Sequence, residues 1–428
     1  MLETLRNAWK DLELRKKILF TLFIIVVFRV GSIIPVPFID PKALSDAAQS
    51  TVNEFFKYMS IMTGGGMEYG AIFAMGVTPY INSSIIMNLL TVAIPALERI
   101  AKEGEAGQKK IAKYTRYATV ILGLIQGIAY FFYLLNSRML TSGAMTNVGT
   151  KIFAGFVIVL CFTAGSALVM WLGEQIDGKG IGNGISILLF AGIISRAPQA
   201  AQTLVAYWGV NKVVTIAIVL AFILVVAFIV WMTDAERRIP VQYSKRVVGR
   251  KMYGGQNTHI PIKVNMSGVM PIIFASSILM IPTMVLSFLK NKESFIYKLL
   301  QPFSMQGLFY ALIYFVFIIA FAYFYTTIQY NPVEMANNLR KNSGAIPGIR
   351  PGKPTSDFIM KILSRITLLG ALCLSVVAVL PIVASSFVQG FNISLGGTSI
   401  IILVGVALDT VKNIESQMML RHHKGFLD

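Results

Sequence analysis

Charged residues are scarce in this sequence. Asp, Glu, Lys and Arg make up 14% of the 428 residues, and the apolar share is 55%. Soluble domains carry about 25% charged residues, so this composition excludes a large water-soluble core. The mean hydropathy of +0.67 agrees with that exclusion. The chain is therefore predicted to be an all-α polytopic membrane protein.

Cysteine and histidine are also rare. Cys161 and Cys373 both lie in apolar segments, which gives neither a disulfide framework nor a CxxC metal site. His259, His422 and His423 form no HExxH pattern. Because a GxSxG motif and a paired His/Asp constellation are lacking as well, an intramembrane enzyme is a remote alternative. The prediction is a protein that is not an enzyme and that uses no metal or cofactor.

What the sequence has instead is a series of long apolar segments. We predict ten membrane spans, at about 18–37, 72–95, 114–135, 152–173, 183–203, 213–232, 267–289, 306–328, 366–388 and 398–415. Ten spans divide as five plus five, and inverted repeats of this kind are common in transport proteins. No residue-level repeat accompanies this symmetry, so it is only suggested. The predicted units are an amphipathic N-terminus (1–17), an N-terminal half (18–205), a C-terminal half (206–415) and a tail (416–428).

The distribution of basic residues predicts the orientation. An even number of spans places both termini on one side. With the termini inside, the cytoplasmic segments hold 28 of the 38 Lys and Arg residues and the external segments hold 9. The positive-inside rule therefore predicts that both termini are cytoplasmic.

Three spans are more polar than lipid contact allows. The span at 72–95 carries Asn82, Ser83 and Asn88, the span at 183–203 is glycine-rich at its start, and the last span holds Asp409. Polar helices persist in a bilayer when they face protein or a water-filled cavity. Close helix packing through small residues is the alternative for any single span. Three such spans in one chain favour a central polar pathway.

An ion-coupled secondary transporter would have a similar number of spans. Such proteins usually need carboxylates or other ion ligands near the bilayer midplane. Only Asp409 comes near a midplane here, and the other spans offer it no acidic or histidine companion. This arrangement counts against a transporter.

Gly64, Gly65 and Gly66 precede the second span and interrupt any helix there, because each glycine costs about 1 kcal/mol relative to alanine in a helix. They could belong to a short half-helix that re-enters the membrane from outside. The sequence alone favours the simpler reading, an ordinary flexible external loop. Nearby, Arg29 lies inside the first span, where an unpaired arginine costs about 2.5–3.5 kcal/mol. A structural partner, or snorkelling toward the outer interface, is expected for it.

Two long basic cytoplasmic loops, at about 233–265 and 329–362, indicate docking of a large acidic partner. The first could form a short hairpin, because apolar residues alternate around Ile239, Val241 and Tyr243. The second is predicted to be a polar loop whose tip, 347–352, is stiffened by two prolines and two glycines around Arg350. Topology alone needs only a few charges near the span ends. The basic residues expected to dock the partner are Arg237, Arg238, Lys245, Arg246, Arg250, Lys251, Arg340, Lys341 and Arg350.

A GxxxxGK spacing at 173–179 resembles a phosphate-binding loop only by accident. Gly180 replaces the required Ser or Thr, and a membrane span precedes the motif instead of a strand. Energy for any transport must therefore come from a partner.

Four long motifs stand out: AIFAMGVTPYINSSIIMNLL (71–90), WLGEQIDGKGIGNGISILLFAGI (171–193), HIPIKVNMSGVMPIIFASSI (259–278) with the basic loop before it, and NPVEMANNLRKNSGAIPGIRPG (331–352). Together they resemble the bacterial SecY family, the central subunits of the protein-conducting channel. The match runs end to end. Asn88 stands where the family usually has Gln, and Asp177 where a hydroxyl residue is common.

The resemblance implies an hourglass pore between two five-span halves, which opens sideways to lipid between spans 2–3 and 7–8. It implies that Gly64–Gly66 belong to a plug at about 61–72 on the outer side of the pore, and that Asn88 lines the lateral gate. A ring of aliphatic side chains can dewet and block ions while offering a passing chain no polar trap. By motif position the ring consists of Ile81, Ile85, Ile185, Leu189, Ile273 and Ile402.

The resemblance also implies the partners. The expected function is outward movement of unfolded secretory chains across the bacterial plasma membrane and sideways release of apolar segments into its lipids. SecE-like and SecG-like small membrane subunits would accompany the chain. The two basic loops would receive a SecA-like motor ATPase or a translating ribosome, through ribosomal RNA or protein, while signal peptides and nascent chains would enter the pore.

Overall fold

The computed structural model describes most of the chain, and its ends and several connections are left out. The described residues are 9, 11–44, 60, 63–141, 143, 147–210, 212–243, 246–248, 251–253, 257–288, 295–303, 308–387 and 397–422. Two of the predicted docking residues, Lys245 and Arg250, lie outside these ranges, as do positions 61 and 62 of the predicted plug.

Long helices form the first part of the chain. Asp11 begins α2 by accepting a hydrogen bond from the backbone N–H of Glu13 (2.9 Å), and Asn183 begins α9 in the same way through Ser186 (3.0 Å). Pro95 opens a short helix that is bent by 101° from the helix before it. The helices are α2 (Leu12–Gly31), α5 (Thr78–Ala93), α6 (Pro95–Lys102), α7 (Glu105–Asn136), α8 (Val148–Lys179), α9 (Gly184–Ile194) and α10 (Ala197–Val210).

The second part is also mainly helical. Its helices are α11 (Lys212–Asp234), α12 (Met270–Phe288), α13 (Phe295–Leu300), α14 (Leu308–Gln329), α15 (Pro332–Lys341), α16 (Lys353–Phe387) and α17 (Gly397–His422), with a 3-10 turn η2 (Gln301–Phe303). The strands are β1 (Glu236–Tyr243), β2 (Arg246–Val248), β3 (Lys251–Tyr253), β4 (Asn257–Lys263) and β5 (Gly344–Ala345).

Each of the ten predicted spans overlaps a helix, although some boundaries were wrong. Within the described residues, six helices are long and apolar enough to cross a membrane, or seven if the bent pair α5–α6 counts as one span. Ten crossings therefore stay a prediction. The second helix begins at Thr78 rather than 72, because 72–77 form turns, and α16 begins at Lys353 rather than 366. The polar, charged first turns of α16 carry the helix beyond the apolar stretch from which the span was read.

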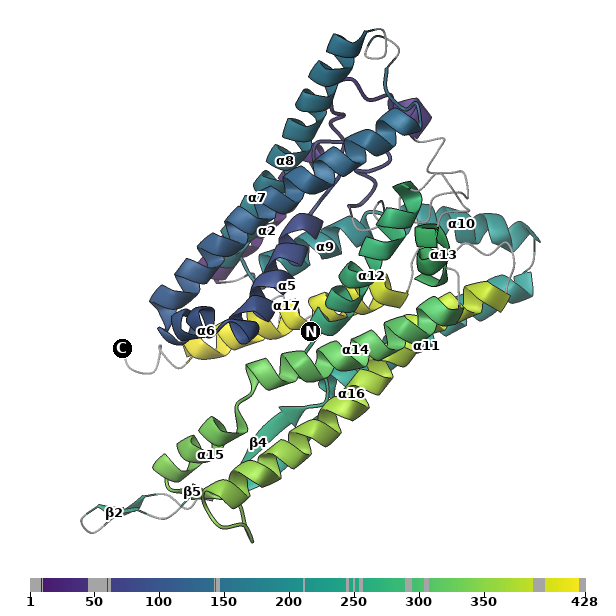
Figure 1. The fold of residues 1–428 in the computed structure, drawn as a ribbon. Coiled ribbons are helices and arrows are strands. Elements are labelled where there is room, and N and C mark those ends of the chain that lie inside the picture. The colour runs from purple at the N-terminus through teal and green to yellow at the C-terminus, as the bar shows by residue number, and fades with distance from the viewer. Residues whose placement is uncertain are drawn as a thin grey trace.

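Figure 1 shows two groups of helices with α12 and α17 between them. In the first group α2 and α9 pack on α8, and α7 lies between α5 and α8. In the second group α16 packs on α14, and α17 contacts both α11 and α16. The groups meet where α12 touches α5 and where α17 touches α9. We call these two helix pairs the seam.

A small sheet covers one end of the second group. Strand β1 pairs antiparallel with β4 along its length, and its end pairs with β5 through Gln242–Ala345 and Tyr243–Gly344. The predicted hairpin is confirmed in part, because β2 and β3 pair across 246–253, but the strand order β4–β1–β5 was not foreseen. Alternation along β1 is confirmed, since Ile239 and Val241 are buried with the apolar residues of α15 and α16.

The prediction that the second basic segment is a loop throughout was wrong, because residues Pro332–Lys341 form the helix α15. Asn331 caps α15 by accepting hydrogen bonds from the backbone N–H groups of Val333 (3.1 Å) and Glu334 (3.4 Å). Leu339 of α15 and Ile346 pack into the same apolar cluster as β1. The low apolar content of this segment hid a helix that is stabilised by tertiary packing instead of by its own sequence.

Replacing Val241 with Asp is expected to unfold the sheet locally. Val241 is 0% exposed, and a carboxylate placed there without a partner costs on the order of 2 kcal/mol or more. Limited proteolysis of the purified protein should then cut within 233–265 at least about tenfold faster, because 1.4 kcal/mol is a factor of ten. The neighbouring Gln242→Asp, at an exposed position of the same strand, is the matched control. Equal protection of the two variants would contradict the packing of β1.

Candidate channel seam, plug and docking face

The six residues of the predicted pore ring lie on the four helices of the seam. Ile81 and Ile85 are on α5, Ile185 and Leu189 on α9, Ile273 on α12 and Ile402 on α17. Five of them are buried in one apolar cluster, and Ile185 is half-buried against it. Four segments separated by up to 321 positions in the sequence thus bring aliphatic side chains into a single cluster at the junction of the two helix groups.

Helical spacing explains how each seam helix contributes. Ile81 and Ile85 are four residues apart, as are Ile185 and Leu189, so each pair lies on one face of its helix. Gly173 of α8 allows α9 to approach closely, because a Cβ there would stand 3.3 Å from Ile185 Cδ1. The six side chains share their cluster with many other aliphatic residues, so burial by itself does not single them out.

The polar residues of α5 divide between packing and the seam. Ser83 is fully buried and donates a hydrogen bond to the backbone carbonyl of Thr115 on α7 (2.7 Å). Close helix packing therefore explains Ser83, as the sequence alternative allowed. Asn88, the predicted lateral-gate residue, is half-buried near the end of α5. Its backbone carbonyl oxygen accepts a hydrogen bond from the Thr91 hydroxyl (2.7 Å). Because α5 contacts α12, Asn88 belongs to a helix of the seam.

The glycine-rich segment is folded and buried. Residues 63–77 run as successive turns, with an isolated bridge between Pro35 and Ala71. Thr63, Met67 and Ala74 are nearly inaccessible, so the expectation of an ordinary flexible external loop was wrong. The alternative, a half-helix read from the apolar stretch Phe55–Thr63, falls mostly outside the described residues and stays a prediction. The segment that follows it forms turns, with positive φ at Gly64 and Gly65. We call residues 63–77 the turn segment.

The turn segment reaches the apolar cluster of the seam. Phe73 stacks on Phe28 of α2, with ring centroids 6.0 Å apart. Phe73 and Val77 belong to the same cluster as the predicted ring residues. On the other side, α8 lies against its backbone, since a Cβ on Gly165 would come within 2.0 Å of the Ile72 carbonyl oxygen.

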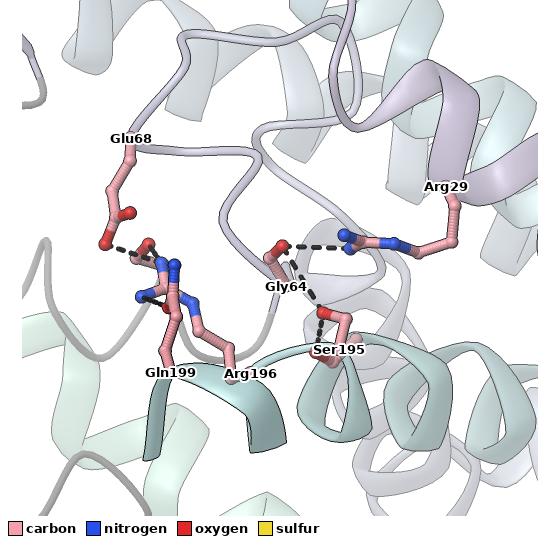
Figure 2. Close-up of polar contacts among 8 residues, drawn as sticks. Arg29, Gly64, Glu68, Ser195, Arg196 and Gln199 are labelled. Atoms are coloured by element: carbon pink, nitrogen blue, oxygen red, sulfur yellow. Dashed lines mark hydrogen bonds and ion pairs between the residues drawn. The ribbon is translucent and has the colours of Figure 1, made fainter. Parts of the chain in front are cut away.

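Two arginines hold the other end of the turn segment (Figure 2). Arg29 Nη1, on α2, donates a hydrogen bond to the Gly64 carbonyl oxygen (2.9 Å). Arg196, between α9 and α10, forms an ion pair through Nη2 with Glu68 Oε1 (2.5 Å) and also contacts the Ser60 hydroxyl. The predicted structural partner of Arg29 is thereby confirmed, as a backbone carbonyl. The sequence identified Arg29 as a charge inside an apolar span. No pattern in the sequence indicated that Glu68 pairs with Arg196.

Most of the described basic residues expected to dock a partner lie on the sheet end of the molecule. Arg237 and Arg238 are exposed on β1, and Arg340 and Lys341 are exposed in the last turn of α15. Arg238 pairs with Glu236 (2.7 Å). Strand β5 joins the second loop to β1 of the first, so the two loops form one surface, which we call the docking face. Arg246 and Lys251 lie on the β2–β3 hairpin that extends from it.

The tip that carries Arg350 makes tight turns at its two glycines, as predicted. Gly348 and Gly352 adopt φ values of +78° and +108°, which few other residues tolerate. The Thr355 hydroxyl donates a hydrogen bond to the Arg350 carbonyl oxygen (2.8 Å) and anchors the tip to the start of α16. The Arg350 side chain is exposed.

Comparison with known proteins decides the family. The SecY family model matches residues 71–411. A protein translocase subunit SecY from Mycobacterium bovis is 42% identical over 446 aligned residues, which cover 100% of both chains. The chain belongs to the SecY family. It is a membrane protein that acts as a protein-conducting channel in protein translocation.

Solved structures agree on the fold of this SecY family member. A SecY structure whose plug domain is described as stabilising the closed state and maintaining a membrane seal has a TM-score of 0.63 and 17% identity, and it covers 95% of this chain and 93% of its own. Sec61 in a canine ribosome–channel complex has a TM-score of 0.59 and 15% identity, with the same coverage.

Proposed function

We propose that this SecY family member moves unfolded polypeptides through a pore at the seam and releases apolar segments sideways between α5 and α12. The observation that carries the proposal is the convergence of six aliphatic residues from four helices at the junction of the two helix groups. Helices that meet along a seam can separate without unfolding either group. The route is therefore a junction between rigid bodies instead of a permanent hole.

The apolar ring acts as the seal of this route. In the resting channel Ile81, Ile85, Ile185, Leu189, Ile273 and Ile402 exclude water, because a narrow aliphatic constriction dewets. An extended chain that enters the ring meets flexible side chains without hydrogen-bonding groups. It can therefore slide without being held at fixed positions.

The turn segment acts as the plug. It is buried between α2, α8 and the seam cluster, and its Gly64–Gly66 sequence allows turns instead of a helix. A relative is described as having a plug domain that stabilises the closed state, which supports the same role here. Sideways release would pass Asn88, whose amide is a modest polar lining for the gate.

The docking face receives the partner that supplies energy. It is basic and exposed, and Arg350 stands on a rigid tip beside it. A relative of the same fold is described in a ribosome–channel complex, which supports a ribosome as one partner. A SecA-like motor is the other, and SecE-like and SecG-like subunits would brace the helix groups. The chain would then sit in the bacterial plasma membrane with both termini cytoplasmic and would itself catalyse no reaction.

Site-specific crosslinking tests the route. A photoreactive residue at Ile85 or Ile273 should crosslink to a stalled secretory chain, because both side chains belong to the proposed ring. The matched control is Ile86, one position along α5, which is 42% exposed and does not belong to the cluster. Crosslinks at Ile86 or elsewhere, with none at Ile85 or Ile273, would overturn the placement of the ring. Ion-coupled solute uptake by the purified protein in liposomes would instead favour a transporter.

A further inference from the structure

We propose that Arg29 and Arg196 are positioning residues that latch the turn segment to the first helix group. The inference rests on the proposed plug. It goes further by stating what keeps the plug in place. It also predicts that separation of the seam does not by itself release the segment.

The first contact of the latch is made with the backbone. Gly64 has a φ of +64°, and its carbonyl oxygen points at Arg29 Nη1 (2.9 Å) and lies 3.4 Å from the Ser195 hydroxyl (Figure 2). The Ser195 hydroxyl has one proton and lies closer to the carbonyl of Gly192, at 2.6 Å. Arg29 is therefore the main donor to Gly64, and this bond is charge-assisted.

No side chain fits at this first contact. A Cβ on Gly64 would stand 2.5 Å from Arg29 Nη1, 2.6 Å from Ser195 Oγ and 2.9 Å from the Gly192 carbonyl oxygen. Gly66, two residues on, would accept a Cβ, since its nearest neighbours would be 3.5 Å away and its φ is not positive. Glycine is therefore required at position 64 both by its positive φ and by the latch contacts, whereas neither constraint applies at Gly66.

The second contact is an ion pair with little access to water. The side chains of Arg196 and Glu68 are 12% and 23% exposed, and they approach to 2.5 Å. Arg196 also donates to Gln199 Oε1 (3.0 Å), which orients the guanidinium from α10. Removing one member of such a pair leaves the other charge poorly solvated. Loss of this pair therefore destabilises the seated turn segment more than loss of an exposed pair would.

Both contacts come from the same side of the seam. Arg29 is on α2, and Ser195 and Arg196 follow α9 directly, so all three belong to the first helix group. If α12 and α17 move away from α5 and α9, these contacts can remain intact. Release of the turn segment is then a separate step, in which Arg29 and Arg196 must both give up their partners.

A thiol-accessibility experiment tests the latch without relying on transport. Met67, in the turn segment, is 2% exposed, so Met67→Cys reports whether the segment is seated. The membrane-embedded complex in nanodiscs, carrying Cys161→Ala and Cys373→Ala, is labelled with a water-soluble maleimide. We expect Glu68→Gln and Arg196→Gln each to raise the labelling rate about tenfold, equivalent to about 1.4 kcal/mol of seating free energy.

Matched variants separate the latch from general damage. The swap Glu68→Arg with Arg196→Glu should restore slow labelling, because it rebuilds the ion pair. Gly64→Ala should accelerate labelling, whereas Gly66→Ala should not. Glu68→Gln removes the same ion pair without altering α10, so a poorly folding Arg196 variant leaves the test intact.

The outcomes distinguish the latch from the plug. Unchanged labelling in Glu68→Gln and Gly64→Ala would overturn the latch, whatever the ion conductance of the channel. Faster labelling with unchanged conductance would support the latch and overturn the plug. Faster labelling with raised conductance would support both.

Discussion

Arg350→Glu is expected to reduce secretion through this channel by at least about tenfold while the protein still accumulates in the membrane. Arg350 is exposed on a tip fixed by two glycines with positive φ and by the Thr355 hydrogen bond. A charge reversal there opposes an acidic or nucleic-acid partner at a defined point. Electrostatic attraction between docking partners changes association rates by about 10–10³-fold. The measurement is export of a reporter protein in cells, beside quantification of the channel in membranes.

Lys353→Glu is the matched control for this variant. Lys353 is also exposed and basic, and its replacement changes the net charge by the same amount. It stands at the start of α16, where a carboxylate is favourable at the helix N-terminus. Normal secretion with Arg350→Glu, or equal losses in both variants, would show that the tip has no particular role.

Deleting Gly64–Glu68 is expected to raise ion leakage through the resting channel several-fold. The deletion removes the carbonyl bound by Arg29 and the carboxylate bound by Arg196. It also pulls Phe73 away from its place against Phe28 and the seam cluster. Without the segment, the ring alone must exclude ions. Planar-bilayer conductance of the reconstituted complex, in the absence of any translocating chain, measures the effect.

A glycine–serine linker of equal length at the same positions keeps a backbone carbonyl at position 64 but removes the Met67 side chain and the Glu68 carboxylate. It therefore separates loss of these side-chain contacts from shortening of the chain. If the contacts matter, the linker variant also leaks. Leakage from the deletion alone would instead indicate strain on α5. Conductance unchanged in both variants would count against the turn segment as a plug.

The fold was largely predictable because a membrane span is a continuous apolar stretch that can be read directly from the sequence. Residues 213–232 are almost uniformly apolar, and the structure has α11 over nearly the same range. The predicted helix boundaries were wrong where apolarity does not determine the end of the helix. Lys353 starts α16 well before its apolar part, and turns occupy the apolar residues 72–77. Helix α15 was missed because its stability comes from packing on the sheet.

Individual site residues were harder to predict from the sequence. The long motifs at 71–90 and 171–193 identified a family, and the family implied which aliphatic residues form a ring. Composition could not choose Ile85 over Ile86, because both are isoleucines in one apolar span. The buried one was distinguished only when α5 was placed against α12.

The sequence by itself determined that this protein lives in a membrane, that its basic loops share one predicted side, and that Arg29 needed a partner. These conclusions depend on transfer free energies and charge counts, which require no knowledge of tertiary contacts. Only the tertiary structure decided that the partner is the Gly64 carbonyl oxygen, that Glu68 meets Arg196, and that β5 joins the two basic loops. Such contacts join residues far apart in the chain, and a local pattern carries no information about which distant segment will be adjacent.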